Sequence, residues 1–107
     1  MIEDKIYDEL FDMKNAIYTK AEFSREYLGK CRTYYNATRT NKRPVSKTAL
    51  VNCWNKLRED VKACDDSMKY ANNSYVLSSI KERRERLNDM SRQVLEALIE
   101  QREYKGV

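Results

Sequence analysis

The 107-residue sequence contains no histidine. Histidine is the side chain most often used as a general base and as a metal ligand, and it completes Ser–His and Cys–His catalytic pairs. With only two glycines, the sequence also has no glycine-rich loop of the kind that cradles phosphates. These absences predict a protein that is not an enzyme and that requires no metal ion or cofactor.

The three cysteines, Cys31, Cys53 and Cys64, are an odd number and lie far apart along the chain. They fit neither a disulfide framework nor the short spacings of a zinc site. We therefore expect small, buried or half-buried thiols in a reducing compartment.

Long apolar runs are also missing. No stretch approaches the roughly 20 apolar residues that a helix needs to cross a bilayer. The first six residues, Met-Ile-Glu-Asp-Lys-Ile, are acidic and lack the apolar core of a signal peptide. The expected location is the cytoplasm, in a bacterium the cytoplasm or nucleoid.

Two glycines and one proline leave few loops, and apolar residues recur at helical spacing along most of the chain. We predict an all-α protein, a compact helix-turn-helix bundle of about four helices followed by a long C-terminal helix. The expected division is a DNA-binding domain at 1–71 and a helix for packing or dimerisation at 72–107. The predicted helices cover about 3–18, a segment from Thr19 that stops at Gly29, roughly 32–40, about 47–70 and about 76–103.

Local signals mark the boundaries of the middle helices. Thr19 and Glu22 have the spacing of a capping box, and Gly29 suits the left-handed position after a helix end. Pro44 disfavours helix in the residue before it, and Ser46 is a good N-cap for the helix that follows.

Charge is distributed unevenly. Residues 16–58 carry ten basic and two acidic side chains, whereas residues 1–15 have a net charge of −3 and residues 59–107 of −1. No acidic residue lies between Glu26 and Glu59. This stretch is attractive to a polyanion, although a solvated basic face is an equally good reading of the charge alone.

The segment Thr19–Arg39, TKAEFSREYLGKCRTYYNATR, combines a capped helix, a glycine turn and a second short helix. It resembles the helix-turn-helix DNA-binding domains of the lambda-repressor and Cro type. It is similar also to small uncharacterised bacterial and phage proteins with an "AEFS…LG…YY" signature. The resemblance covers about residues 16–60. It implies that Phe23 and Leu28 pack the first helix of the motif, and that Tyr35 anchors the recognition helix.

The resemblance also implies two sets of DNA contacts, because arginine and asparagine suit bidentate reading of guanine and adenine edges in the major groove. Residues facing the bases are Arg32, Thr33, Asn36, Ala37 and Thr40. Residues contacting phosphates are Lys20, Lys30, Arg39, Lys42, Arg43, Ser46 and Lys47.

The last predicted helix has a narrow apolar seam that fits an imperfect heptad pattern. The seam residues are Ile80, Leu87, Met90, Val94 and Leu98. Such a seam fits packing within the chain or a dimer contact, and the dimer is slightly favoured.

The leading functional prediction is a sequence-specific double-stranded DNA-binding protein, a dimeric transcriptional regulator that reads the major groove with residues 32–40. The alternative is a small protein-binding module, such as a phage-type inhibitor or adaptor that engages a host protein with the same basic face. Tyr34 and Tyr35, set among arginines, keep single-stranded nucleic acid as a third possibility.

Overall fold

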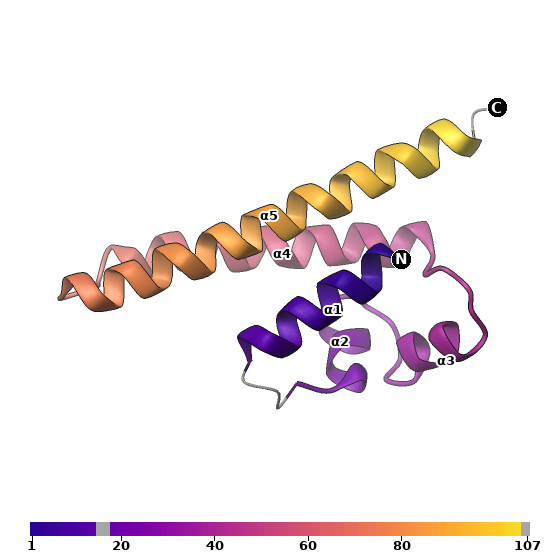
Figure 1. Cartoon of the computed structure of the whole chain (residues 1–107), viewed down its shortest axis with the longest axis horizontal. Coiled ribbons are helices and arrows are strands. Elements are labelled where there is room, and N and C mark those ends of the chain that lie inside the picture. Colours follow the sequence, from indigo (N-terminus) through magenta and orange to yellow (C-terminus); the bar gives the residue numbers. More distant parts are fainter. Residues whose placement is uncertain (15–17, 106–107) are drawn as a thin grey trace.

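A computed structural model describes residues 1–14 and 18–105, with side chains up to residue 100. The described part is all-helical (Figure 1). Its helices are α1 (Ile2–Met13), α2 (Lys20–Glu26), α3 (Tyr34–Thr40), α4 (Lys47–Met68) and α5 (Ser74–Lys105). In these residues, no helix combines the length and apolar character that a bilayer crossing requires.

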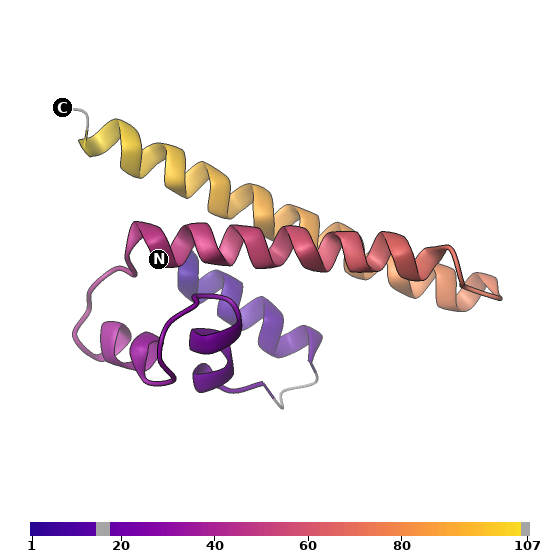
Figure 2. The same ribbon diagram turned by 180° about the vertical axis from the view of Figure 1, so that it is seen from behind.

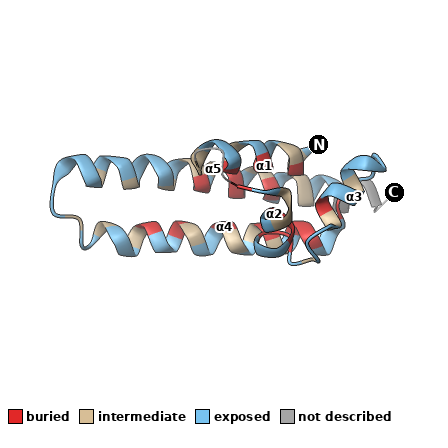
Figure 3. Ribbon diagram, turned by 90° about the horizontal axis from the view of Figure 1, so that it is seen from below, coloured by how far each residue is buried: buried red, intermediate tan, exposed pale blue. Residues whose placement is uncertain are grey.

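The two long helices, α4 and α5, form an antiparallel hairpin, and the three short helices pack along one side of it (Figures 1 and 2). The hairpin extends beyond the short helices as an arm. Along that arm most residues are exposed, whereas buried residues concentrate where α4 and α5 meet α1 and α2 (Figure 3). The core therefore lies at one end of the hairpin.

Helix α1 presents Ile6, Tyr7 and Leu10 to the core, and acidic residues occupy its first turn. Acidic groups are favourable there because the N-terminal end of a helix is the positive end of its dipole. The helix ends at Met13, so the prediction that it runs to residue 18 is wrong. Tyr18 is only 2% exposed although it lies outside any helix. Ile17, which continues the helical spacing of Ile6, Leu10 and Met13 in the sequence, lies outside the described residues.

The predicted boundaries of α4 are confirmed to within two residues, and α5 begins two residues earlier than predicted. The Ser46 hydroxyl accepts a hydrogen bond from the Ala49 N–H at 3.1 Å, as expected of an N-cap. Ahead of α5, the side-chain carbonyl of Asn73 accepts from the Val76 N–H at 2.8 Å.

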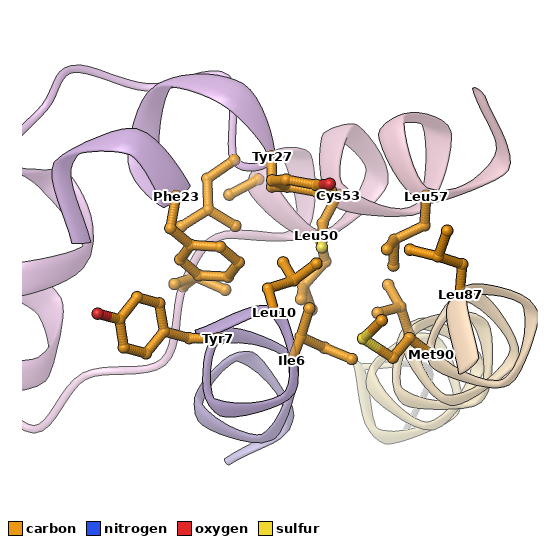
Figure 4. Packing of buried hydrophobic residues seen from close by; sticks show 14 of the residues in the cluster. Ile6, Tyr7, Leu10, Phe23, Tyr27, Leu50, Cys53, Leu57, Leu87 and Met90 are labelled. Carbon is orange, nitrogen blue, oxygen red and sulfur yellow. The ribbon is translucent and has the colours of Figure 1, made fainter. Parts of the chain in front are cut away.

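The centre of the core is aromatic. The ring of Phe23 packs edge-on against the ring of Tyr35, with centroids 4.9 Å apart, and edge-on against Tyr7 at 5.5 Å. The rings of Tyr18 and Tyr27 extend the same cluster. Figure 4 shows how this cluster continues into the aliphatic side chains of α1, α4 and α5. Edge-to-face pairs of this kind stabilise a core beyond the area they bury.

Helix α5 belongs to this core. Leu87, Met90 and Val94 are 3%, 1% and 0% exposed, and Ile80 and Leu98 pack partly buried against the same cluster. The chain's own helices cover Leu87, Met90 and Val94, which leaves these three no exposed surface for a second copy, whereas a dimer contact through Ile80 and Leu98 stays a prediction. The apolar seam therefore fits packing within the chain, and Leu87, Met90 and Val94 share one core with buried residues of α1 and α4.

Ion pairs reinforce the attachment of α5 to α1. The Arg86 guanidinium lies 3.0 Å from a carboxylate oxygen of Asp12 and 3.4 Å from one of Glu9. These carboxylates raise the pKa of Arg86, and because all three side chains are at least partly exposed, their contribution to stability is small.

Candidate nucleic-acid interface

Helix α2 begins where the capping box places it, but it ends at Glu26, short of the predicted stop at Gly29. The Thr19 hydroxyl accepts a hydrogen bond from the Glu22 N–H at 3.1 Å. After the helix, Gly29 has a φ of +62°, and the Lys30 N–H donates to the carbonyl of Ser24 at 2.9 Å. The side-chain amide of Asn52 on α4 donates to the Leu28 carbonyl at 3.0 Å. The turn is therefore held by both the chain's own backbone and α4.

We expect Gly29→Ala to lower the free energy of unfolding by about 1–3 kcal/mol, because φ is positive there and strains an L side chain. A Cβ at residue 29 would also lie 2.6 Å from the Asn52 amide nitrogen. Urea unfolding measures this change. Lys42 is the matched control because its φ is also positive, at +53°. Lys42→Gly should leave stability unchanged or raise it, and an equal loss in both variants would contradict this explanation.

Helix α3 is anchored on its inner side by Tyr35, which is 1% exposed. The Tyr35 N–H donates to the Ser24 hydroxyl at 3.0 Å, and that hydroxyl donates to the Lys20 carbonyl at 2.9 Å. The Tyr35 hydroxyl donates to the Asp4 carboxylate. Burial, followed by the hydrogen bond to Asp4, raises the pKa of Tyr35, so its hydroxyl stays protonated. The start of α3 is thus fixed to both α2 and α1.

The loop from α3 to α4 is held at several points. The Arg43 N–H donates to the Thr38 carbonyl at 2.8 Å, and the Ser46 N–H donates to the Tyr34 hydroxyl at 2.8 Å. Val45 is buried, whereas Arg43 and Ser46 are exposed. The loop therefore presents its polar residues to solvent from a fixed backbone.

Glu3 lies beneath this loop and is 4% exposed. Burial raises the pKa of the Glu3 carboxyl, and the backbone N–H groups of Glu3 and Val45 offset part of that effect. A raised pKa in the folded state means that stability is highest below the ordinary carboxyl pKa of about 4 and falls as the pH rises through the folded value.

We therefore expect Glu3→Gln to be more stable than the wild type at pH 7, with the difference vanishing near pH 4. Thermal unfolding at the two pH values measures it. Asp8→Gln, at an exposed position on the same helix, is the control and should show no such gain. If Glu3→Gln gained no stability over the wild type at pH 7, or gained more at pH 4 than at pH 7, the burial of a charged Glu3 would not explain the effect.

The predicted base-contacting residues are all exposed. Asn36, Ala37 and Thr40 lie on α3 at spacings that place them on one side of the helix, opposite Tyr35. Helix α3 begins at Tyr34, two residues later than predicted, so Arg32 and Thr33 lie in the turn before it. Arg32 therefore reaches the same surface from a turn and not from a recognition helix.

The predicted phosphate-contacting residues surround this surface in two groups. Arg39, Lys42, Arg43, Ser46 and Lys47 are exposed, whereas Lys20 and Lys30 are partly buried. The ammonium of Lys30 lies 5.8 Å from the ring centroid of Tyr34, and that of Lys20 lies 5.9 Å from the ring centroid of Tyr7. Lys20 therefore lies beside α1, and the other cations are distributed over the turn, α3 and the start of α4.

These cations differ from those on α5 in their ion pairing. Arg84, Arg86 and Arg92 on α5 each pair with a carboxylate. Among the residues that the structure describes, none of the six predicted phosphate-contacting cations forms an ion pair, and neither does Arg32. The surface formed by α3, the turn before it, the loop after it and Lys47 at the start of α4, which we call the α3 face, therefore has uncompensated positive charge.

Several residues that shape this face were not identified from the sequence. Asp4 orients Tyr35, Ser24 joins α2 to α3, and Asn52 closes the turn at Gly29. The small size of Ser24, between Phe23 and Arg25, was an available signal for close packing. No sequence spacing connects Asp4 or Asn52 to partners 31 and 24 residues away.

The cysteines are free thiols, and Cys53 and Cys64 are buried as expected. Cys31 is exposed, so the expectation of a buried or half-buried position is wrong for it. Hydrogen bonds with Thr33 lower the pKa of Cys31, whereas burial raises that of Cys53 to about 12. In the described part of the chain, no three His, Cys, Asp or Glu side chains gather as a metal site would require.

Comparison with known proteins adds a family but no function. The sequence profile of a family of unknown function matches residues 4–106. No curated protein and no solved structure matches the chain.

Proposed function

We propose that this chain, which belongs to that family of unknown function (DUF6626), binds double-stranded DNA through the α3 face and regulates transcription. The observation that carries the proposal is the unpaired, exposed positive charge around a short polar helix held on a rigid aromatic core. Phosphate contacts by such cations position a protein on duplex DNA, and side chains of the helix then read base edges.

Geometry and chemistry favour duplex over single-stranded nucleic acid. Tyr35 is 1% exposed and bound to Asp4, so it offers no ring for a base to stack on. Tyr34 is partly buried, and its hydroxyl accepts the Ser46 N–H. On the side of α3 away from Tyr35, the exposed residues Asn36, Ala37 and Thr40 are instead suited to hydrogen bonding and methyl contact in a major groove.

The proposal includes a homodimer, built from residues other than the buried seam. Arg58 on α4 donates to the side chain of Asn88 on α5 at 2.7 Å, so these two residues lie opposite one another across the antiparallel hairpin. Two helical turns along each helix from that pair, Val51 comes opposite Leu95. Val51, Leu95 and Ile99 are 39%, 42% and 48% exposed, so these apolar side chains are available to a second copy.

Asn36 tests the proposed reading of bases. Asn36→Ala removes an exposed amide from α3 and no charge, so we expect a loss of about 1–3 kcal/mol in binding to the preferred duplex, with the salt dependence unchanged. Fluorescence anisotropy with a selected duplex and a scrambled duplex measures both. Asn55→Ala, at an exposed position on α4, is the control and should bind like the wild type. Equal binding of both duplexes by the wild type would refute sequence-specific reading.

A further inference from the structure

A cleft of about 320 Å³ opens between α1, α2, α4 and α5. It lies outside the α3 face and shares none of the residues assigned above to DNA contacts. Its volume is at the lower end of the range typical of small-molecule sites, which are mostly apolar with a few polar groups that fix orientation.

The floor of the cleft is apolar and comes from three helices. Leu10 and Met13 belong to α1, Cys64 to α4, and Ile80 and Leu87 to α5. Leu10 and Leu87 are 1% and 3% exposed, so the floor is part of the packed core, where Figure 4 shows both side chains. An apolar group placed on this floor would be removed from water.

The rim is polar, and most of its charges already have partners. Lys14 pairs with Glu26 at 3.9 Å, and Lys56 pairs with Asp60 at 3.4 Å. Asp60 also accepts a hydrogen bond from the Tyr27 hydroxyl. Arg83 is the remaining charged residue of the rim. It is exposed, and within the described residues it forms no ion pair. The rim therefore carries one uncompensated positive charge.

We propose that this cleft binds a small monocarboxylate with an unbranched apolar chain, whose carboxylate contacts Arg83 and whose chain lies on the floor formed by α1, α4 and α5. One free guanidinium complements one carboxylate, which it contacts through two parallel hydrogen bonds. A ligand with several negative charges would need more free cations than this rim offers. An uncharged apolar ligand would leave the Arg83 charge without a partner.

Octanoate is a suitable probe of the cleft. Because it is tested on the full chain without DNA, the result is independent of the proposed DNA binding. We expect saturable binding by isothermal titration calorimetry and by amide shifts of residues around the cleft. Arg83→Gln should weaken octanoate binding by about tenfold or more, the size of effect given by a hydrogen bond to a charged group. Lys81→Gln, at an exposed residue of α5 outside the cleft, loses the same charge and should bind octanoate like the wild type.

Two further measurements distinguish binding of the carboxylate by Arg83 in the cleft from non-specific binding of an apolar chain. Octan-1-ol should bind more weakly than octanoate, and Arg83→Gln should not change its affinity. Ala63→Phe, which adds a ring at an exposed residue lining the cleft, should abolish binding of both probes. The proposal is overturned if octanoate shows no saturable binding, if Arg83→Gln binds it like the wild type, or if Lys81→Gln weakens it equally.

Discussion

Replacing Lys42, Arg43 and Lys47 together by glutamine is expected to weaken binding to duplex DNA several hundredfold at 0.1 M salt. Each phosphate contact releases about 0.9 of a counterion, so each contributes about eightfold at this salt concentration. These three residues are exposed and form no ion pair among the described residues, so their substitution removes no contact of this kind from the fold. Thermal stability should therefore change little.

The salt dependence of the same variant gives a second, independent readout. The slope of log K against log salt concentration should become shallower by about 2.7 for three lost contacts. The matched control replaces Lys62, Lys69 and Lys81, which are exposed residues of the hairpin arm, and removes the same net charge. If the control loses as much affinity as the α3-face variant, general charge and not this face accounts for the binding.

Leu87→Asp is expected to destabilise the fold strongly. Leu87 is 3% exposed in the core shared by α1, α4 and α5, and an unpaired carboxylate there should cost at least about 4 kcal/mol. That is a large part of the stability of a typical small domain. Circular dichroism and a thermal melt measure the loss.

Leu95→Asp is the matched control on the same helix, two turns away. Because Leu95 is 42% exposed, this change should alter stability by no more than about 0.5 kcal/mol. Sedimentation should show that Leu95→Asp shifts a wild-type dimer towards folded monomer. If Leu87→Asp instead stayed folded and lost only its dimer, the apolar seam of α5 would be the dimer contact.

Local signals in the sequence predicted much of the fold. Thr19, Gly29 and Ser46 each act on backbone groups within six residues, so their effects are encoded locally, and the structure confirms all three. The all-helical class and the long last helix follow from periodicity and are also confirmed. The end of α1 was missed because the helical spacing of apolar residues continues in the sequence to Ile17, whereas the helix ends at Met13.

Partners across the fold could not be predicted. The apolar spacing of Leu87, Met90 and Val94 indicates that one side of α5 is covered, but an apolar stripe does not identify the surface that covers it. The same holds for the α3 face. Its exposed residues were named from a resemblance, whereas its supports, Asp4 and Asn52, are distant in sequence and became visible only through their hydrogen bonds.

The most direct test of DNA binding by the α3 face is retention of a random duplex pool by the wild-type protein at 50 and 200 mM salt, followed by sequencing. The account predicts enrichment of one motif, palindromic for a homodimer, with affinity that falls steeply between the two salt concentrations. Retention of DNA without enrichment of a motif would indicate that the α3 face binds DNA only non-specifically. No retention even at 50 mM salt would contradict the account and favour a protein partner for the same face.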